Sequence, residues 1–412
     1  MRLIDELKYR GLLSDVTDEA IGDKLESESM TFYVGADPTA KSLHVGHLIS
    51  YLVSKRLLER GHKPILLIGG GTGLIGDPSG RGSERQLLTL ETSLENAEGI
   101  ASQVRRILPN AQVVNNYDWI SKFNVITFLR DIGKHFNINN MLNKDSVKSR
   151  LENGISFTEF SYQIIQSLDF LHLYDTENCR LQIGGQEQWG NITAGLDLIR
   201  KVNGPEAKAY GLTWPLLLKS DGTKFGKSAG GAVWLDKDLT SPYEFYQYWI
   251  NTPDADAVDR LKKFTFMSIE ETEEVIKAFE EAPHQRLAQK KVAEELTVLV
   301  HGKEAYESAL NISRALFSGD VKSLNASEIS EGFKDVPSIE ITEDKLLVDL
   351  LIEAGLASSK RESREFIKNN AVSVNGEKVS DLEFMVKREN GIDQSFTVLR
   401  RGKKKYSLVK HF

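Results

Sequence analysis

Residues 32–71, FYVGADPTAKSLHVGHLISYLVSKRLLERGHKPILLIGGG, hold the pattern that decides the fold. Residues 32–34 and 65–68 are short apolar runs that end at glycines, as buried strands often do. Between them, residues 43–60 repeat apolar side chains at helical spacing and stop at Gly61. Strand, helix and strand of this kind predict a βαβ unit with a parallel sheet, and hence an α/β domain.

Working outward, the alternation of helices and strands continues to about residue 235, and residues 87–150 within it are mostly helical apart from a strand-like piece at 111–114. From 236 to 318 the strand signals vanish and helices dominate. Residues 319–344 are acidic and polar and predict a linker. Residues 345–412 return to two helices and a hairpin at Asn375-Gly376, which predicts a small α+β domain.

The composition is that of an ordinary globular chain of 412 residues, long enough for two or three domains. Cys179 is the only cysteine and no histidine pair has metal-ligand spacing, so neither a disulfide framework nor a protein-bound metal is predicted. The first residues show no signal segment, and no stretch approaches a run of about 18 apolar residues. A cytoplasmic protein without a membrane span is therefore expected.

The net charge of −7 is unevenly distributed along the chain. Residues 345–412 hold 14 Lys and Arg against 9 Asp and Glu, a net charge of +5, whereas the other residues carry −12. A basic appendage on an acidic body is typical of proteins that contact nucleic acid, although chance also gives such asymmetry.

His44-Val45-Gly46-His47 is the strongest local signal for chemistry. Its histidines, expected on one face at the start of a helix, follow the first strand, where backbone amides and the helix dipole favour a phosphate. The imidazoles could donate to phosphate or ribose oxygens, and Gly46 would let a flat ring such as adenine approach. Taken alone, the motif also fits two surface histidines beside a permissive glycine.

Lys224-Phe225-Gly226-Lys227-Ser228 is the second signal, in a loop bounded by further glycines. Two lysines three residues apart would stabilise negative charge on a triphosphate as pyrophosphate departs. Taken alone, the segment reads equally well as a solvated basic turn.

Together, the HVGH helix and the later KFGKS loop on a parallel α/β domain resemble the class I aminoacyl-tRNA synthetases. KFGKS departs from the commoner KMSKS at its two central positions but keeps both lysines and the serine. Along its whole length the chain is similar to tyrosyl-tRNA synthetases of the bacterial type. Five segments carry this likeness: Tyr33–Thr39, Gly73–Gly80, Ser161–Asp169, Gln182–Asn191 and Lys224–Ser228.

The resemblance implies a Rossmann-type catalytic domain over residues 1–235, an α-helical anticodon-proximal domain over 236–318 and an S4-like RNA-binding domain over 345–412. It implies a homodimer, with residues 115–155 as the dimerisation region. The implied reaction activates L-tyrosine with ATP to tyrosyl-adenylate and pyrophosphate, and then transfers the tyrosyl group to the 3′-terminal adenosine of tRNA(Tyr). Mg²⁺ is expected to accompany ATP, held by phosphate oxygens and water.

Matched residue by residue, the family pattern implies a tyrosine site. It assigns Tyr33 and Asp169 to the substrate hydroxyl, Asp77, Tyr162 and Gln166 to its ammonium, and Gln182 to the pocket. Tyr162, Gln166 and Asp169 also form a polar stripe on one helical face of an apolar segment, which needs a ligand to satisfy it. Without the family pattern, Tyr33 reads as a core tyrosine and Asp169 as a surface acid.

The same comparison implies an ATP site. Thr39, His44, Lys224, Lys227 and Ser228 are assigned to the phosphates, and His47 and Glu187 to the ribose. Gly35, Asp37, Gly46, Gly185 and Gln188 complete the expected ATP contacts. Glu187 stands where an aspartate is expected, and Val34 and Ser50 stand where Cys and Thr are common, so these two are expected to pack rather than to bond.

For RNA, the basic domain offers Lys360, Arg361, Arg364 and Lys368 at helical spacing, expected to contact phosphates. For any one of them a solvated face is the simpler reading. A tryptophanyl synthetase, a nucleotidylyltransferase and a non-catalytic RNA-binding descendant of a synthetase are the rival functions. The pair Tyr33 and Asp169 argues against a tryptophanyl synthetase, and the RNA-binding domain argues against a nucleotidylyltransferase. The intact lysines argue against a non-catalytic descendant.

Overall fold

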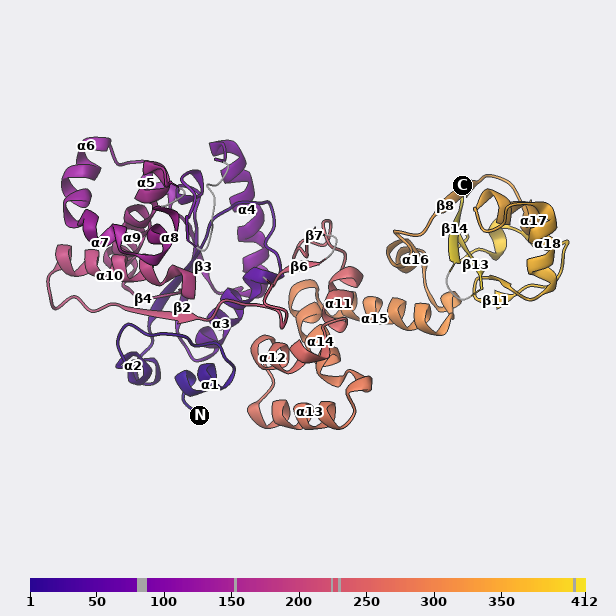
Figure 1. The fold of residues 1–412 in the computed structure, drawn as a ribbon, viewed down its shortest axis with the longest axis horizontal. Helices are drawn as coiled ribbons and strands as arrows, with labels where there is room; N and C mark the ends of the chain where they lie inside the picture. Colours follow the sequence, from indigo (N-terminus) through magenta and orange to yellow (C-terminus); the bar gives the residue numbers. More distant parts are fainter. Residues whose placement is uncertain (80–86, 152–153, 224, 229–230, 403–404) are drawn as a thin grey trace. The chain divides into compact units, whose positions relative to one another are not determined.

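The computed structural model describes residues 1–79, 87–151, 154–223, 225–228, 231–402 and 405–412 (Figure 1). These residues separate into two compact units. The N-terminal unit comprises Met1–Thr240 and Tyr248–Leu296, and the C-terminal unit comprises Ser241–Gln247 and Thr297–Phe412. Each unit has a hydrophobic core of its own.

A five-stranded parallel sheet forms the centre of the N-terminal unit, which confirms the predicted α/β class. Its spatial order is β3 (Gln112–Asn115), β2 (Lys63–Ile68), β1 (Thr31–Ala36), β4 (Cys179–Gly185) and β5 (Tyr210–Trp214). The chain runs outward from β1 to β3 and then returns to β4 on the other side of β1, so the strand order reverses between β1 and β4. In such sheets the crevice at the carboxyl ends of these strands is the usual ligand site.

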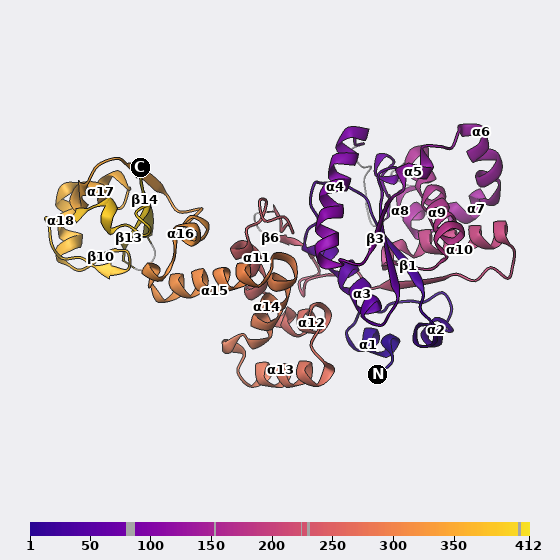
Figure 2. The same cartoon turned by 180° about the vertical axis from the view of Figure 1, so that it is seen from behind.

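Helices cover both faces of this sheet, and this burial is why its strands are almost wholly apolar. Figures 1 and 2 show α3 (Leu48–Glu59) and α4 (Leu90–Ile107) on one face, with α9 (Phe157–Glu177) and α10 (Trp189–Asn203) on the other. The crossovers through α3 and α10 run in opposite directions along the sheet, and because both are right-handed they reach opposite faces. Cys179, the first residue of β4, is fully buried here.

Short helices complete the sheet's surroundings. They are α1 (Leu3–Tyr9), α2 (Ile21–Ser27), and the 3₁₀ turns η1 (Val45–His47), η2 (Thr72–Leu74) and η5 (Gln186–Gln188). The sequence places one helix over residues 43–60, whereas the structure has η1 first and α3 only from Leu48. The hydrogen bonds of the two histidines to the backbone of η1 explain this difference, because they cap the turn before the α-helix begins.

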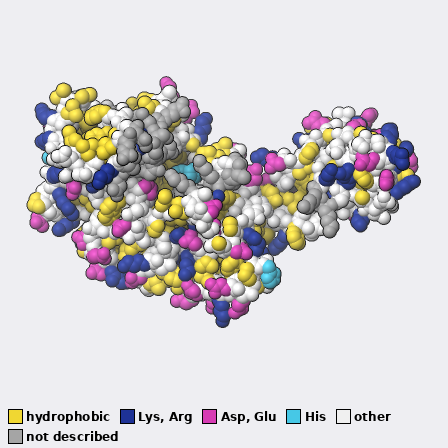
Figure 3. All heavy atoms as spheres, in the orientation of Figure 1, with side chains coloured by type: hydrophobic (Ala, Val, Ile, Leu, Met, Phe, Trp, Pro, Cys, Tyr) yellow, Lys and Arg dark blue, Asp and Glu magenta, His cyan; other side chains and the backbone are white. Residues whose placement is uncertain are grey.

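Residues 117–151 form a run of short helices between β3 and α9, where the sequence predicts an inserted helical region. They are α5 (Tyr117–Ile120), α6 (Val125–Thr127), the π-helical η3 (Phe128–Ile132), η4 (Gly133–His135), α7 (Ile138–Leu142) and α8 (Asp145–Leu151). This run exposes several large apolar side chains, which Figure 3 shows near α6.

A small two-stranded piece, β6 (Lys227–Ser228) with β7 (Gly231–Ala232), precedes a helical stretch that agrees with the prediction for 236–318. Its helices are α11 (Pro242–Ile250), α12 (Asp254–Phe264), α13 (Ile269–Glu281), η6 (Pro283–Gln285), α14 (Leu287–His301) and α15 (Lys303–Ser318).

The C-terminal unit contains a five-stranded sheet with helices packed on it, as expected of a small α+β domain. Its strand order is β11 (Glu377–Lys378), β10 (Val372–Val374), β13 (Phe396–Arg401), β14 (Lys405–His411) and β8 (Ser338–Ile341). The other elements are β9 (Lys345–Leu346) paired with β12 (Met385–Val386), the helices α17 (Leu347–Glu353) and α18 (Lys360–Lys368), and the 3₁₀ turn η8 (Arg388–Asn390).

Residues 319–344 differ from the linker that the sequence predicts. They contain η7 (Val321–Ser323), α16 (Ala326–Gly332) and β8, and β8 pairs with β14 through Ser338–Leu408 to Ile341–His411. Ile329 and Phe333 are buried in one cluster with Val398 and Leu408. A few well-spaced apolar residues are enough to fold this polar stretch into the C-terminal core.

Among the described residues, no helix combines the length and hydropathy that crossing a membrane requires.

Candidate active site

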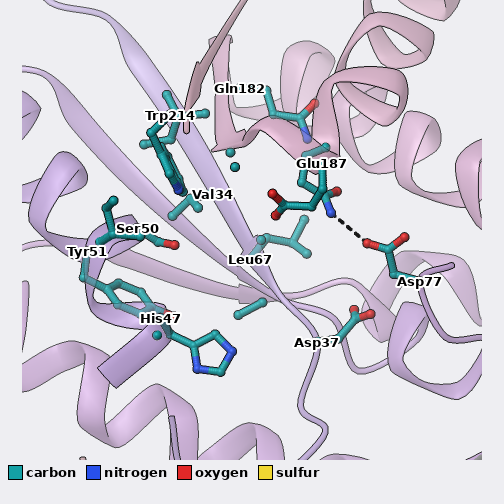
Figure 4. A pocket seen from close by; sticks show the side chains of 18 of the residues that line it. Val34, Asp37, His47, Ser50, Tyr51, Leu67, Asp77, Gln182, Glu187 and Trp214 are labelled. Atoms are coloured by element: carbon teal, nitrogen blue, oxygen red, sulfur yellow. Dashed lines mark hydrogen bonds between the residues drawn. The ribbon is translucent and has the colours of Figure 1, made fainter. Parts of the chain in front are cut away.

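A cavity of ≈ 380 Å³ opens at the carboxyl ends of β1 and β4, where the strand order reverses (Figure 4). Its walls come from β1, η1 and α3, from α9, and from the turn after β4. All of the residues assigned above to tyrosine or to ATP that lie outside the KFGKS loop line this cavity. Figure 4 shows Asp37 and Asp77 on one side of it and His47, Ser50 and Tyr51 on the other.

The HVGH histidines are fixed by hydrogen bonds to their own turn. His47 Nδ1 accepts from the His44 backbone N–H at 3.2 Å, and His44 Nδ1 accepts from the Gly46 N–H at 3.0 Å. The centroids of the two imidazole rings lie 3.9 Å apart. Because Nδ1 is the acceptor in each neutral ring, the ring proton is on Nε2, which makes that nitrogen a donor suited to phosphate or ribose oxygens.

Gly46 is required by its neighbours. A Cβ there would lie 2.7 Å from His44 Cε1, so the glycine makes room for the folded-back imidazole.

Tyr33 and Asp169 both line the cavity and are buried, each 1% exposed. The Tyr33 hydroxyl has no hydrogen-bond partner among the described residues, and its ring packs edge-on against Phe170. Burial, followed by the negative charge of Asp169, raises the pKa of Tyr33 well above its usual value. A buried hydroxyl is seldom left unpaired, so this one is suited to a polar group of a ligand.

Two residues that the sequence does not single out hold Asp169. Trp119 Nε1 donates to Asp169 Oδ1 at 2.8 Å, and Asn116 Nδ2 donates to Oδ2 at 2.9 Å. Burial raises the pKa of Asp169 to about 7, while both hydrogen bonds oppose that rise. One signal could have identified Asn116: it directly follows the strand β3, at the same sheet edge as the motifs.

The polar stripe of α9 joins a hydrogen-bonded network. The Tyr162 hydroxyl donates to Asp37 Oδ2 at 3.0 Å, and Gln166 Nε2 donates to Gln188 Oε1 at 3.3 Å. Gln188 Nε2 in turn donates to Asp77 Oδ2 at 2.8 Å, the bond drawn in Figure 4. The network therefore presents carboxylate, phenol and amide oxygens to one side of the cavity, an arrangement that suits an ammonium group.

Two further residues support this network without having been predicted. Asn191 Nδ2 donates to Gln166 Oε1 at 3.0 Å, and Thr72 Oγ1 donates to Asp37 Oδ1 at 2.7 Å. Asn191 ends the segment Gln182–Asn191 that carries the family likeness, although no role was assigned to it, whereas Thr72 lies outside the five segments.

Strand β4 brings Gln182 and Gly185 to the cavity, and the turn η5 after it brings Glu187. A Cβ on Gly185 would lie 2.4 Å from both carboxylate oxygens of Glu187, so this glycine makes room for the longer acid. Gln182 Oε1 is buried and has no hydrogen-bond partner among the described residues. Thr39, Gly35, Val34 and Ser50 also line the cavity.

Part of the KFGKS loop cannot be placed in this site. Lys224, like Gly80 of the second family segment, lies outside the described residues, and for Lys227 and Ser228 only the backbone, strand β6, is described. Phe225 does line the cavity.

The described lining is acidic. It includes Asp37, Asp77, Asp169 and Glu187 but, among the residues that the structure describes, no lysine or arginine. A ligand with an ammonium group is favoured there, whereas a triphosphate needs cations from elsewhere. Nor does the described part of the chain bring three or more His, Cys, Asp or Glu side chains together as a metal site.

The four predicted RNA-contacting residues lie on α18 in the C-terminal unit, and all four are exposed: Lys360, Arg361, Arg364 and Lys368. Figure 3 shows Lys and Arg side chains gathered where Figure 1 places α18. Lys360 forms an ion pair with Asp349 at 2.7 Å. The helix thus offers a basic, solvent-facing surface.

Two family models match the chain. Residues 25–318 match the class I tRNA synthetases (W and Y), and residues 328–409 match the C-terminal domain of tyrosine–tRNA ligases. Tyrosine–tRNA ligase of Bacillus pumilus is 56% identical over 417 residues, and tyrosine–tRNA ligase 1 of Bacillus subtilis is 55% identical over 416, each alignment covering 99% of both chains.

Among solved structures, a C-terminally truncated mitochondrial tyrosyl-tRNA synthetase of Aspergillus nidulans superposes with a TM-score of 0.69. It is 31% identical and covers 77% of this chain and 94% of its own. The strand order, the pocket at the β1–β4 crevice and the full-length relatives agree, and the chain belongs to the class I tRNA synthetases, among the bacterial tyrosyl enzymes of the tryptophan and tyrosine family.

Proposed function

We propose that the chain is an ATP-dependent tyrosine–tRNA ligase that acts in two steps. The tyrosine carboxylate attacks the α-phosphorus of ATP, which forms tyrosyl-adenylate and releases pyrophosphate. The terminal adenosine hydroxyl of tRNA(Tyr) then attacks the acyl carbon and releases AMP. Tyrosine is supported as the substrate by one observation above all: the Tyr33 hydroxyl is buried and unpaired among the described residues, and it lies in the same pocket as Asp169.

Tyrosine is held at both ends in this proposal. Its hydroxyl donates to Asp169 and accepts from Tyr33, so phenylalanine would leave two buried groups unpaired. Its ammonium lies among Asp77, Tyr162 and Gln166, which face the cavity from two different elements. The carboxylate is then directed toward the η1 turn.

ATP occupies the other part of the cavity. His44, Thr39 and the loop residues Lys224, Lys227 and Ser228 contact the phosphates, and His47 and Glu187 contact the ribose. The tyrosine carboxylate is ionised at neutral pH, so the first step depends on alignment and on stabilising charge rather than on a general base. Because the described lining is acidic, the lysines are needed to offset the phosphate charge.

Mg²⁺ would be bound mainly through ATP. A magnesium ion prefers phosphate oxygens and water with one or two carboxylates, and the pocket carboxylates Asp37 and Asp77 already accept hydrogen bonds from the protein. The ion would supply positive charge to the departing pyrophosphate.

For tRNA, we assign Lys360, Arg361, Arg364 and Lys368 of α18 to the phosphate backbone. Such contacts orient the RNA and read little sequence. We place the reaction in the cytoplasm, since its substrates are tRNA, ATP and tyrosine.

The active molecule is a homodimer in this proposal. Exposed apolar side chains concentrate in one short segment, and a second copy of the chain would cover them. They are Phe123, Val125, Ile126, Leu129, Ile138, Leu151 and Phe157, with Ile126 71% and Phe157 74% exposed.

Exchange of pyrophosphate into ATP tests the proposal. We expect exchange with tyrosine, none without an amino acid, and little with tryptophan or phenylalanine. Exchange with tryptophan in place of tyrosine, or without any amino acid, would replace this function by a rival one.

A further inference from the structure

Arg260 on α12 contacts the chain before the KFGKS segment and also Phe225, the second residue of that segment. Its Nη2 donates to the Leu218 carbonyl at 2.5 Å, and its guanidinium carbon lies 4.6 Å from the centre of the Phe225 ring. Asp256, one turn earlier on α12, accepts from the Ser220 N–H at 2.9 Å. One helix thus fixes three points of this loop.

The Phe225 side chain is enclosed by aromatic rings as well. Its ring centre lies 5.5 Å from that of Phe264, 5.8 Å from Trp249 and 6.0 Å from Tyr248. Burial raises the pKa of the Tyr248 phenol to about 12, although its hydrogen bond with the Gly226 backbone acts in the opposite direction. Phe225 is therefore held on the loop's inner side by a cluster of aromatic rings, although the residue is only partly buried and also lines the cavity.

The next residue touches the HVGH turn directly. A Cβ on Gly226 would lie 3.2 Å from Gly46 N and 3.3 Å from Gly46 Cα, and its φ of +103° is one that other residues rarely adopt. The two signature segments therefore meet backbone to backbone, and any shift of Phe225 displaces this contact.

The C-terminal end of α12 and the residues that follow it are hydrogen-bonded to arginines next to α1 and on α3. Arg10 of the segment after α1 donates to the Lys262 carbonyl at 3.1 Å and to the Met267 carbonyl at 2.5 Å. Arg56 of α3 donates to the Thr265 carbonyl. These arginines satisfy carbonyls that the end of a helix leaves open. Because α3 directly follows the HVGH turn, the helix that holds the loop is fixed to the helix that continues from the histidines.

We propose that Arg260 is a positioning residue that sets where the KFGKS lysines stand relative to the HVGH histidines. It acts through the Phe225 ring and the Leu218 carbonyl, not through ATP. The inference rests on the proposed function, because it takes the phosphate chemistry of the loop from there.

The cost of burying a charge supports this role. Arg260 is 2% exposed, and it is paired with Asp259 at 2.6 Å. A well-packed apolar side chain is often as stable as a buried ion pair, so stability alone gives little reason for an arginine here. A planar guanidinium can stack on a ring and donate to a carbonyl at once, whereas an apolar side chain cannot donate and a lysine ammonium has no plane to stack.

The test compares Arg260→Met with Arg286→Met in the full chain. Arg286 is the matched control, because it also donates to backbone carbonyls of this helical stretch, those of Ile250 and Thr252, but makes no loop contact that the structure describes. Three quantities are measured: tyrosine affinity, the single-turnover rate of adenylate formation, and the rate of transfer from preformed adenylate to tRNA.

For Arg260→Met we expect adenylate formation to slow roughly 10- to 100-fold, the effect of a small misplacement of reacting groups. Tyrosine affinity and the transfer rate should stay unchanged, and Arg260→Lys should recover only part of the loss. Arg286→Met should leave all three quantities unchanged.

A double-mutant cycle keeps the inference falsifiable if Arg260→Met is generally destabilised. When Phe225→Leu is combined with Arg260→Met, the two losses in adenylate formation should not add, because both act through one contact. The inference would be overturned if the two losses were additive. It would also be overturned if Arg260→Met lowered all three quantities equally or changed none of them. Absence of tyrosine-dependent exchange in the unaltered protein would instead overturn the proposed function.

Discussion

At the proposed tyrosine site, binding depends on single polar atoms, and the Tyr33 hydroxyl is one that can be removed by itself. Replacing Tyr33 with Phe keeps the ring packed on Phe170 and removes only the donor. Because a neutral hydrogen bond contributes about 0.5–1.5 kcal/mol, we expect the KM for tyrosine to rise roughly 2- to 12-fold. The KM for ATP should not change. Exchange kinetics measure both, with Tyr174→Phe outside the pocket as the control, and equal tyrosine KM values would remove Tyr33 from the site.

The carboxyl of Asp169 gives a pH-dependent prediction. Burial raises its folded pKa from 3.8 to about 7, so between these values the folded chain holds a proton that the unfolded chain has lost. The free energy of unfolding contributed by this group therefore falls as the pH rises through that window. Urea unfolding of the wild type and of Asp169→Asn should show the wild type losing stability relative to the variant from about pH 4 to pH 7. A difference independent of pH would contradict this.

Motif residues could be predicted because each has a fixed spacing: His44 to His47, and Tyr162 to Asp169 on one helical face. The pocket contains them because parallel strands bring their carboxyl ends to one edge. Trp119 and Thr72 could not be predicted, since they act on other residues and carry no spacing of their own. The crowding of Gly46 by the His44 ring could not be predicted, because the rotamer of His44 depends on hydrogen bonds that a sequence does not reveal.

At the scale of elements, α18 presents its basic residues to solvent. Changing Arg361 and Arg364 to Gln should raise the KM for tRNA, and the steepness of log affinity against log salt should decrease by about 1 for each phosphate that the variant no longer neutralises. Tyrosine-dependent exchange should be unaffected. Lys8→Gln with Lys63→Gln, both exposed in the N-terminal unit, is the control pair. An unaltered salt slope would show that α18 does not bind RNA.

The exposed apolar side chains near α6 give a second prediction at this scale. Val125 and Ile126 are 70% and 71% exposed, and glutamate at both positions would put charge into the interface that we propose. We expect sedimentation velocity to show a dimer for the wild type and a monomer for the double variant. Leu239→Glu, at a residue 51% exposed elsewhere, should remain dimeric. A wild-type monomer, or a double variant that still dimerises, would contradict the assignment.

Elements with a strong period were predicted closely, whereas the polar stretch at 319–344 was not. Its apolar residues are separated by acids and glycines, so no window has enough periodicity to indicate an element. Their burial depends on Val398 and Leu408, more than 60 residues later in the chain. A local sequence pattern cannot indicate a contact with residues that lie so far away along the chain.

At the scale of the whole molecule, this stretch predicts how the chain tolerates truncation. A chain that ends after Asp344 would keep β8 but lose its partner β14. Ile329 and Phe333 would also lose Val398 and Leu408. We expect limited proteolysis to cut rapidly within residues 319–344 of the truncated chain and slowly in the full chain. Equal rates of cutting in both chains would mean that the stretch behaves as a linker after all.

The buried Cys179 has a practical consequence for solution work on this enzyme. Burial raises the pKa of its thiol to about 12 and leaves the side chain unexposed, so thiol-directed dyes should not label it. A cysteine introduced at exposed Lys8 and another at exposed Arg361 would then be the reactive pair, one dye site in each unit. Energy transfer between the two dyes would report the distance from one unit to the other, and would follow how that distance changes when tRNA arrives.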